Sequence, residues 1–247
     1  MKPKLEVVKL TKDFEQGKGK YPTLQDIDIS IAENEFVSIV GRSGCGKSTM
    51  LNLMMGLLAP TSGDILVDGK PVTGPGLDRG MVFQQGGLFP WLTAIKNIEF
   101  GPKNAGLPKE ERRRLALSLI ELVHLEGSED KYPKELSGGM QQRVAIARAL
   151  ATNPEILLMD EPFGALDQLT RESMQRELLR IWESHKTTVV FVTHGIMEAI
   201  YLSDRVLVFG THPGHIKQEF KIDLPRPRQP SSPRFMEHHD EIYQAIY

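Results

Sequence analysis

Hydrophobic and polar residues alternate along the first third of the chain, in LEVVKL (5–10) and LQDIDISI (24–31). Alternation at every second residue predicts strands with one buried and one solvent-facing side. Four later segments are short and apolar without alternation, which indicates strands buried on both faces of a parallel sheet. These segments are FVSIV (36–40), GMVF (80–83), ILLM (156–159) and TVVFVT (188–193). Together they predict an α/β fold in which helices cover a parallel sheet.

A helical period appears in KEERRRLALSLIELVHL (109–125). Its apolar residues fall on one face of a helix. The residues on this face are Leu115, Leu119, Leu122 and Val123. We therefore expect a helical lobe, at about residues 86–150, inserted into the sheet domain. The arginine triplet 112–114 is interpreted as a solvated helix face, with phosphate binding as the alternative.

The last part of the chain differs in composition. Residues 221–233 are rich in proline, which predicts a poorly structured connector to a short final helix. The expected organisation is one main domain over residues 1–220, with the helical lobe inside it, followed by the connector and helix over 221–247.

Composition and charge narrow the class of protein. The 247 residues contain 30 Lys and Arg against 32 Asp and Glu, so no overall positive field attracts nucleic acid or an acidic membrane. The single cysteine, Cys45, cannot form an internal disulfide, which favours a cytosolic setting. We expect no signal peptide, and no apolar run reaches the roughly 18 residues that a membrane helix needs. A role at a membrane would therefore require a second, membrane-spanning chain.

The segment GRSGCGKST (41–49) matches the phosphate-binding pattern G-x-x-x-x-G-K-[ST]. It directly follows an expected buried strand and directly precedes the helical pattern STMLNLMMGLL. Its backbone N–H groups would surround nucleotide phosphates, while Lys47 would reach the β- and γ-phosphates and the Ser48 hydroxyl would bind Mg²⁺. A glycine turn without a ligand is the alternative. The residues expected to hold the nucleotide here are Gly41, Arg42, Ser43, Gly44, Cys45, Gly46, Lys47, Ser48 and Thr49.

Polar side chains follow the apolar strands at their carboxyl ends, where open α/β sheets bind ligands. ILLMDE ends in Asp160 and Glu161, GMVFQ ends in Gln84, and TVVFVTH ends in His194. Because successive strand residues face opposite sides, Asp160 would hold Mg²⁺ while Glu161 would orient or deprotonate a water molecule. Ordinary structural residues remain the alternative for all four. Their convergence on one edge favours a site, provided that the strands are parallel neighbours.

A second helix start resembles an anion site, in ELSGGMQQRVAIARAL (135–150). Ser137 is a favourable N-cap, and Gly138 and Gly139 would let a ligand approach the backbone. The helix then continues with apolar residues at Val144, Ala147 and Leu150 or Ala151. This segment would bind either a different anion or the γ-phosphate of a nucleotide held by another subunit. A two-fold dimer in which each chain lends this segment to the other is consistent with the second reading.

The motif LSGGMQ, together with the phosphate loop, MDEP, GALD and the VTH strand, resembles the ATP-hydrolysing subunit of ABC transporters. The resemblance covers about residues 4–220 and keeps the motifs in the family's order. It implies a P-loop NTPase fold with a RecA-like parallel-sheet core, an antiparallel β subdomain and a helical subdomain. It also implies ATP and Mg²⁺ as cofactors and a second copy of the chain as partner.

The resemblance assigns roles to particular residues. Glu161 would be the catalytic carboxylate, assisted by Lys47, by Gln84 near Mg²⁺ and by His194 as the switch histidine. Mg²⁺ would be bound by Ser48, Gln84 and Asp160. The loop 164–167 would be the D-loop. ATP would be contacted across the dimer by Ser137, Gly138, Gly139 and Gln141.

Adenine stacks in this family on an aromatic residue just after the first strand. Phe14 is the match by position, and Tyr21 is the alternative. Either ring could instead pack in the core.

Within the family, the chain resembles importers of nitrate, sulfonate and taurine, through FPWLTAIKNI, DQLTRESMQRELLRIW, EAIYLSDRV, HPGHI and LPRPR. Such importers use separate integral membrane permease subunits and an extracytoplasmic solute-binding protein, which places the chain on the cytoplasmic face of the inner membrane as a peripheral subunit. The permease contact is expected at 88–92, unless Trp91 is buried. The sequence departs from the family pattern at Gly86, Gly87 and Gly195. It does not identify the transported solute.

Two alternative functions stay open at this stage. An exporter or lipoprotein-release ATPase would share every catalytic residue. A soluble ABC ATPase acting on nucleic acid would usually carry long coiled-coil insertions, zinc sites or two nucleotide domains. We expect no nucleic-acid partner, because the sequence has none of these features.

Overall fold

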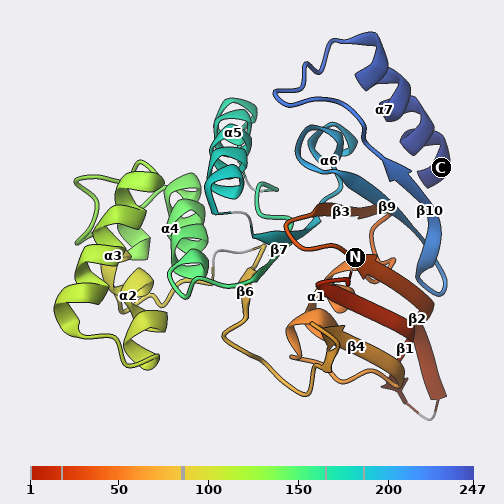
Figure 1. Ribbon diagram of the computed structural model, residues 1–247, viewed down its shortest axis with the longest axis horizontal. Coiled ribbons are helices and arrows are strands. Elements are labelled where there is room, and N and C mark those ends of the chain that lie inside the picture. The colour runs from red at the N-terminus through yellow and green to blue at the C-terminus, as the bar shows by residue number, and fades with distance from the viewer. Residues whose placement is uncertain (1, 18, 85–86, 165, 186) are drawn as a thin grey trace. The chain divides into compact units, whose positions relative to one another are not determined.

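The computed structural model describes residues 2–17, 19–84, 87–164, 166–185 and 187–247 (Figure 1). The chain forms two compact units, one made of Met1–Gly76 with Thr187–Tyr247 and the other of Leu77–Lys186. Here we call them the loop unit and the helical unit. None of the described helices has the length and apolar character that crossing a bilayer requires.

An antiparallel sheet forms the first part of the loop unit. It contains β1 (Leu5–Gln16), β2 (Gly19–Ile31), β4 (Ser62–Val67) and β5 (Lys70–Pro71), in the order β2-β1-β4-β5. In β2, Ile27, Ile29 and Ile31 are buried while Asp28 and Ser30 between them are exposed. The prediction of strands with one solvent-facing side is therefore confirmed.

Buried parallel strands form the second part of the loop unit. Strand β3 (Phe36–Gly41) lies between β8 (Thr188–Val192) and β9 (Arg205–Gly210) and runs parallel to both. Strand β10 (His215–Lys221) pairs antiparallel with β9. Every residue of β3 and β8 is buried, as expected from their continuous apolar runs.

Three helices complete the loop unit: α1 (Lys47–Met55), α6 (Ile196–Leu202) and α7 (Pro233–Ile246). The final helix has 14 residues. Its Phe235 and Ile242 are fully buried in one cluster with residues of α6 and β9. Helix α7 is thus part of the core of this unit.

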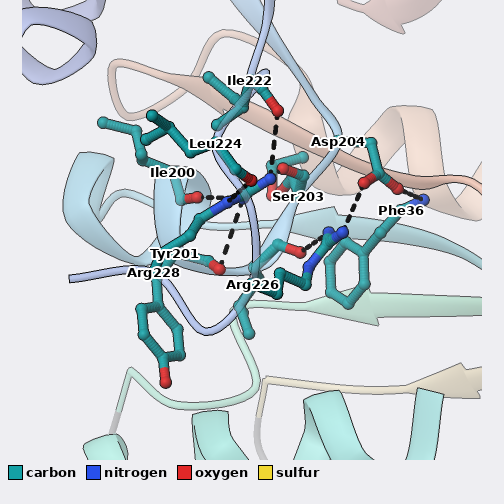
Figure 2. Close-up of polar contacts among 11 residues, drawn as sticks. Phe36, Ile200, Tyr201, Ser203, Asp204, Ile222, Leu224, Arg226 and Arg228 are labelled. Atoms are coloured by element: carbon teal, nitrogen blue, oxygen red, sulfur yellow. Dashed lines mark hydrogen bonds and ion pairs between the residues drawn. The ribbon is translucent and has the colours of Figure 1, made fainter. Parts of the chain in front are cut away.

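The expected connector has a defined place in the loop unit. Residues 222–232, all of which the structure describes, form no helix or strand. Even so, Arg228 is only 5% exposed and donates hydrogen bonds to several backbone carbonyls (Figure 2). Burial lowers the pKa of Arg228 to about 10, so the guanidinium stays charged at neutral pH. The segment is irregular in its backbone but fixed by its side chains.

The helical unit contains two parallel strands and most of the helices. Strand β6 (Arg79–Val82) pairs with β7 (Ile156–Asp160), in agreement with the predicted runs. The other elements are α2 (Ala94–Asn104), α3 (Lys109–Leu122), the 3₁₀ turn η1 (Pro133–Glu135), α4 (Gly138–Leu150) and α5 (Gln168–His185). Helix α2 packs against both α3 and α4.

The predicted apolar face of α3 needs a correction. Leu119 and Val123 are buried, whereas Leu115 and Leu122 are only partly buried. Ala116 and Ile120 are buried in addition. The face is rotated because α3 packs against α4 as well as α2. In the arginine triplet 112–114, the second and third residues are exposed, as the solvated-face interpretation expects.

Candidate functional site

The glycine loop joins the carboxyl end of β3 to the start of α1. Gly46 has φ +95°, and a Cβ there would lie 2.6 Å from the Leu24 side chain. A Cβ at Gly41 would lie 2.7 Å from the Phe209 carbonyl oxygen. Only glycine fits at both places, so the chain can turn sharply from the strand into the helix. This strand-loop-helix arrangement is the one that the phosphate-binding pattern requires.

The Lys47 side chain lies against the loop that precedes it. It is 5% exposed, and its Nζ donates to the carbonyl oxygens of Gly41 at 2.9 Å and Arg42 at 3.2 Å. The first backbone bond of α1 runs from Met50 to Gly46, so the N–H groups of the first turn lie at the loop. An ammonium group and a helix N-terminus therefore meet at one place, which suits a polyanion.

The remaining loop residues divide into an exposed and a buried set. Arg42, Ser43, Gly44 and Ser48 are exposed, and Thr49 is half-buried. Arg42 also lies 5.4 Å from the ring centroid of Tyr247, a neighbour that the sequence analysis did not identify.

Cys45 faces the interior of the protein. Its side chain is 1% exposed, and burial raises the pKa of the thiol. Its backbone N–H donates to the Arg42 carbonyl at 3.3 Å. The side chain of Cys45 thus packs in the core.

His194, at the end of β8, contacts the same loop. Its Nδ1 lies 3.2 Å from the Gly41 carbonyl oxygen, which also accepts from Lys47. Because a carbonyl only accepts, Nδ1 carries the proton in this contact. The contact arises because β8 and β3 are parallel neighbours, so their carboxyl ends lie side by side.

The start of α6, directly after His194, contains a chain of hydrogen bonds that the sequence did not predict. The Gly195 N–H donates to the Thr193 hydroxyl at 2.9 Å, and that hydroxyl donates to the Glu198 carboxylate. A Cβ on Gly195 would lie 3.3 Å from Glu198 Cβ, tighter than ordinary contact. A side chain at position 195 would therefore have to displace Glu198 by a few tenths of an ångström.

The helical unit brings together Gln84 and Glu161. The Gln84 Nε2 donates to Glu161 Oε2 at 3.1 Å. Asp160 is the last residue of β7 and is 8% exposed, whereas Glu161 has φ +43°. Glutamate rarely adopts this conformation, which turns the backbone sharply after Asp160. Gln84, just beyond β6, and Glu161 thus meet at one edge of the parallel pair, as expected for neighbouring strand ends.

The side chains predicted to bind Mg²⁺ have the chemistry that this ion prefers. Ser48 offers a hydroxyl, Asp160 a carboxylate and Gln84 an amide oxygen, and Mg²⁺ binds such hard oxygen donors. The described residues include no group of three His, Cys, Asp or Glu side chains that could hold a metal. Each of these three groups is of the kind that Mg²⁺ accepts when it takes few protein ligands and completes its shell with phosphate oxygens and water.

Ser137 caps α4 as predicted, because its Oγ accepts from the Met140 N–H at 3.3 Å. A Cβ built on Gly138 would meet no described atom within 4 Å, so the backbone is open there. Gln141 turns inward instead, and its Nε2 donates to the carbonyls of Pro133 at 3.0 Å and Leu136 at 3.2 Å. A hollow of about 370 Å³ lies beside this helix start, lined among others by Ser137, Gly139, Arg143 and Thr170.

The expected D-loop leads into α5. Asp167 accepts from the Thr170 N–H at 3.1 Å, and hydrogen bonds from Thr170 lower the pKa of its carboxyl. Arg171 donates to the carbonyls of Leu166 at 2.8 Å and Phe163 at 3.3 Å. Residue 165 lies outside the described residues. Residues at the start of α5 thus hold the loop by hydrogen bonds near its beginning and at its end.

The aromatic rings of both adenine-stacking candidates are exposed to solvent. Phe14 and Tyr21 are direct partners in the β1–β2 register and are 38% and 47% exposed. Lys12 Nζ lies 5.0 Å from the Phe14 ring centroid. Neither ring packs in the core, so the core-packing alternative is excluded for both.

The segment expected to contact a permease is exposed. Trp91 is 70% exposed, which excludes the alternative that it is buried. Its ring centroid lies 5.6 Å from that of Phe89, which is in turn 4.4 Å from that of Phe100. The fully buried Asn97 holds Phe89 by accepting from its N–H at 2.8 Å and donating to its carbonyl at 3.2 Å.

Gly86 lies outside the described residues, while the Gly87 carbonyl accepts from Arg148 at 2.8 Å.

Comparison with known proteins agrees with these features. A family model described as ABC transporter matches residues 24–164. An uncharacterized ABC transporter ATP-binding protein of Methanocaldococcus jannaschii is 55% identical over 246 residues, covering 100% of this chain and 92% of that protein. The nitrate import ATP-binding protein of Synechocystis sp. is 46% identical over 251 residues, covering 98% of this chain and 94% of that protein.

A solved structure shares the fold. It is the dimeric structure of an ATP-binding cassette in a post-hydrolysis state with ADP and Pi, with a TM-score of 0.80 and 37% identity, covering 90% of this chain and 100% of that chain. Its match confirms the predicted fold class of parallel strands, antiparallel β subdomain and helices. The chain therefore belongs to the ABC transporter family, as an ATP-binding subunit that hydrolyses ATP.

Proposed function

We propose that this chain is the ATPase of an importer and that it works as a homodimer with two ATP molecules and Mg²⁺ between the copies. The observation that carries ATP turnover in this proposal is the contact of Lys47 and His194 with one carbonyl of the phosphate loop, that of Gly41. This arrangement gathers a phosphate-binding lysine and a histidine at the end of a buried strand. The dimeric cassette with ADP and Pi supports the homodimer.

In the proposed mechanism, Glu161 accepts a proton from the water that attacks the γ-phosphate. The amide nitrogen of Gln84 orients the carboxylate. Mg²⁺ would be held by the Gln84 amide oxygen, the Ser48 hydroxyl and the Asp160 carboxylate. The ion, when bound, neutralises charge on the phosphate oxygens. Lys47 stabilises the charge of the β- and γ-phosphates, while His194 lies at the end of β8 to contact the γ-phosphate.

The open helix start at Ser137, Gly138 and Gly139 would complete the pocket of the partner copy. It offers backbone N–H groups and the positive end of a helix dipole to the γ-phosphate. Gln141 would support this surface from behind by holding η1, given its two inward hydrogen bonds. Phe14, or Tyr21 opposite it, would stack on adenine.

The transport partners follow from the importer branch. The exposed segment around Trp91 would bind an integral membrane permease, which would place the chain at the cytoplasmic face of the inner membrane. A solute-binding protein outside the membrane would take part indirectly. The relative named for nitrate import supports a small anion-type solute, such as nitrate, sulfonate or taurine.

ATP-driven dimerisation tests the shared pocket. The Glu161→Gln chain with Mg-ATP is expected to become a dimer in light scattering and to stay monomeric without ATP. Adding Ser137→Arg should abolish the dimer while nucleotide binding persists, because the chain's own phosphate loop is unchanged. A dimer of the double variant would contradict the role of Ser137 across the interface.

A further inference from the structure

Helix α6 is held at both ends by groups outside its hydrogen-bonding pattern. It has seven residues, far fewer than the roughly 12 that an isolated helix needs even for marginal stability. The hydrogen bonds that join Gly195, Thr193 and Glu198 fix its N-terminal end, directly after His194. The last carbonyls of any α-helix have no N–H partner within the helix, so those of α6 need donors from elsewhere.

Two arginines supply such partners: Arg226 donates to the Leu202 carbonyl at 2.6 Å, and Arg228 makes the larger set of contacts. The Arg228 guanidinium donates to the carbonyls of Ile200 and of Ser203, the latter at 2.6 Å, at the end of α6 (Figure 2). On its other side it donates to the carbonyls of Ile222 at 3.2 Å and Leu224 at 3.1 Å. A guanidinium presents five N–H groups in a rigid plane, so it can join two backbone segments that a lysine ammonium could not. A cation here is also favoured by the helix dipole.

The same corner of the chain is tied to strand β3. The side chains of Ser203 and Ser38 are hydrogen-bonded to each other. Asp204 accepts from the Phe36 N–H at 2.9 Å and from Arg226 at 2.7 Å (Figure 2). Phe36 is the first residue of β3 and Gly41 is the last.

Helix α6 thus extends between two fixed points on one strand. Its C-terminal end is attached near the start of β3, and His194 before its N-terminal end meets the carbonyl of Gly41 at the other end of β3. A shift of the C-terminal end would be passed along this short helix to the imidazole.

We propose that Arg228 is a positioning residue for His194: by fixing the C-terminal end of α6, it keeps the imidazole at the Gly41 carbonyl, beside Lys47. The inference rests on the proposed role of His194 in ATP turnover. It assigns a function in ATP turnover to the LPRPR segment (224–228), which lies outside the nucleotide-binding motifs.

The test replaces Arg228 by lysine, which keeps the charge but cannot span the four carbonyls. Arg228→Lys is expected to lower kcat by about 10- to 100-fold, since small displacements of catalytic groups cost this much. KM for ATP should change by less than about twofold, because the phosphate loop is untouched. Arg234→Lys, at an exposed arginine of α7, is the matched control and should leave both values unchanged.

A spectroscopic measurement separates positioning from a general loss of stability. Imidazole ¹⁵N NMR, with His194 assigned through His194→Gln, should show a protonated Nδ1 in the parent chain. We expect this signature to be lost in Arg228→Lys and kept in Arg234→Lys. An unchanged His194 signal in Arg228→Lys overturns the proposal, whatever happens to kcat.

Failure of the underlying function would look different. Normal turnover in His194→Ala would remove the catalytic role of His194, while the NMR comparison would still decide whether Arg228 positions the ring. In the His194→Ala background, Arg228→Lys should lower kcat no further, and a further loss would contradict the proposal. If Arg228→Lys does not fold, Arg228→Gln, whose amide also donates, is measured in its place by the same criteria.

Discussion

The side-chain amide of Gln84 donates to the carboxylate of Glu161 over 3.1 Å. These residues are 77 positions apart in the sequence, and the parallel pairing of β6 with β7 brings them together. The bond leaves Glu161 with a defined orientation after the sharp turn at its own backbone.

Replacing Glu161 by glutamine should abolish most ATP hydrolysis and preserve ATP binding. Glutamine still accepts from Gln84 through its amide oxygen but cannot take a proton from water, so kcat is expected to fall by about 10²- to 10³-fold. Phosphate release and nucleotide binding measure the two effects. Glu183→Gln, at an exposed carboxylate of α5, is the control. Unchanged hydrolysis in Glu161→Gln would remove the assigned role.

Lys47→Ala should weaken both binding and hydrolysis. Charge-assisted hydrogen bonds contribute about 1.5–3 kcal/mol, so the affinity for ATP should fall by about 10- to 100-fold. Isothermal titration measures this directly. Lys103→Ala, at an exposed lysine of α2, should bind ATP normally. Equal affinity of the two variants would argue against phosphate binding by Lys47.

Phe14→Ala should weaken ATP binding more than Tyr21→Ala. Stacking of a base on an aromatic ring is worth about 1–3 kcal/mol, and both rings are exposed, so neither change creates a core cavity. Affinities for ATP and for triphosphate alone separate base stacking from phosphate binding. A larger loss for Tyr21→Ala would transfer the role to Tyr21.

Cys45 should react slowly with iodoacetamide, with or without ATP. Its position in the phosphate loop suggests protection by nucleotide, but burial already shields the side chain and raises the pKa of the thiol. The folded state therefore disfavours the thiolate. The protonated Cys45 thiol contributes its full stabilisation of the fold below the pKa that the thiol has in the unfolded chain. This stabilisation is lost as pH rises through the higher pKa of the folded chain. Mass spectrometry should show that labelling of the folded chain increases as pH rises from the thiol pKa of the unfolded chain to that of the folded chain. In denaturant, labelling should be complete. Rapid labelling of the folded chain at neutral pH would contradict this.

Under the proposed transport role, Trp91→Ala should leave ATP hydrolysis of the isolated chain unchanged and weaken its binding to a membrane permease. The side chain is 70% exposed, so its removal costs little stability. The measurement is recovery of the chain with washed membranes of cells that also produce a candidate permease. Leu169→Ala, at a 78% exposed residue, serves as the control. Full membrane recovery of the Trp91 variant would exclude an anchoring role.

The parts of the fold that sequence predicts well are those determined locally. The four apolar runs formed strands, and the glycine loop lies between a buried strand and a helix, because both signals depend on adjacent residues. The face of α3 was partly wrong because two neighbouring helices, not one, determine what it buries.

The Arg228 contacts could not be predicted in the same way. Their acceptors are backbone carbonyls of residues 200–203 and 222–224, which carry no side-chain signal. In the sequence, the arginines of LPRPR contribute only to a family resemblance. Proline-rich composition predicts an irregular backbone correctly, but it does not reveal that the side chains are fixed.

The open aromatic pair of the β1–β2 hairpin has a consequence for nucleotide choice. Phe14 offers a ring face and no group that could distinguish the amino edge of adenine from the keto edge of guanine. Under the proposed role, the chain would accept GTP almost as readily as ATP. The relative concentrations of ATP and GTP in the cell, rather than selectivity of the binding site, would then decide which nucleotide is hydrolysed.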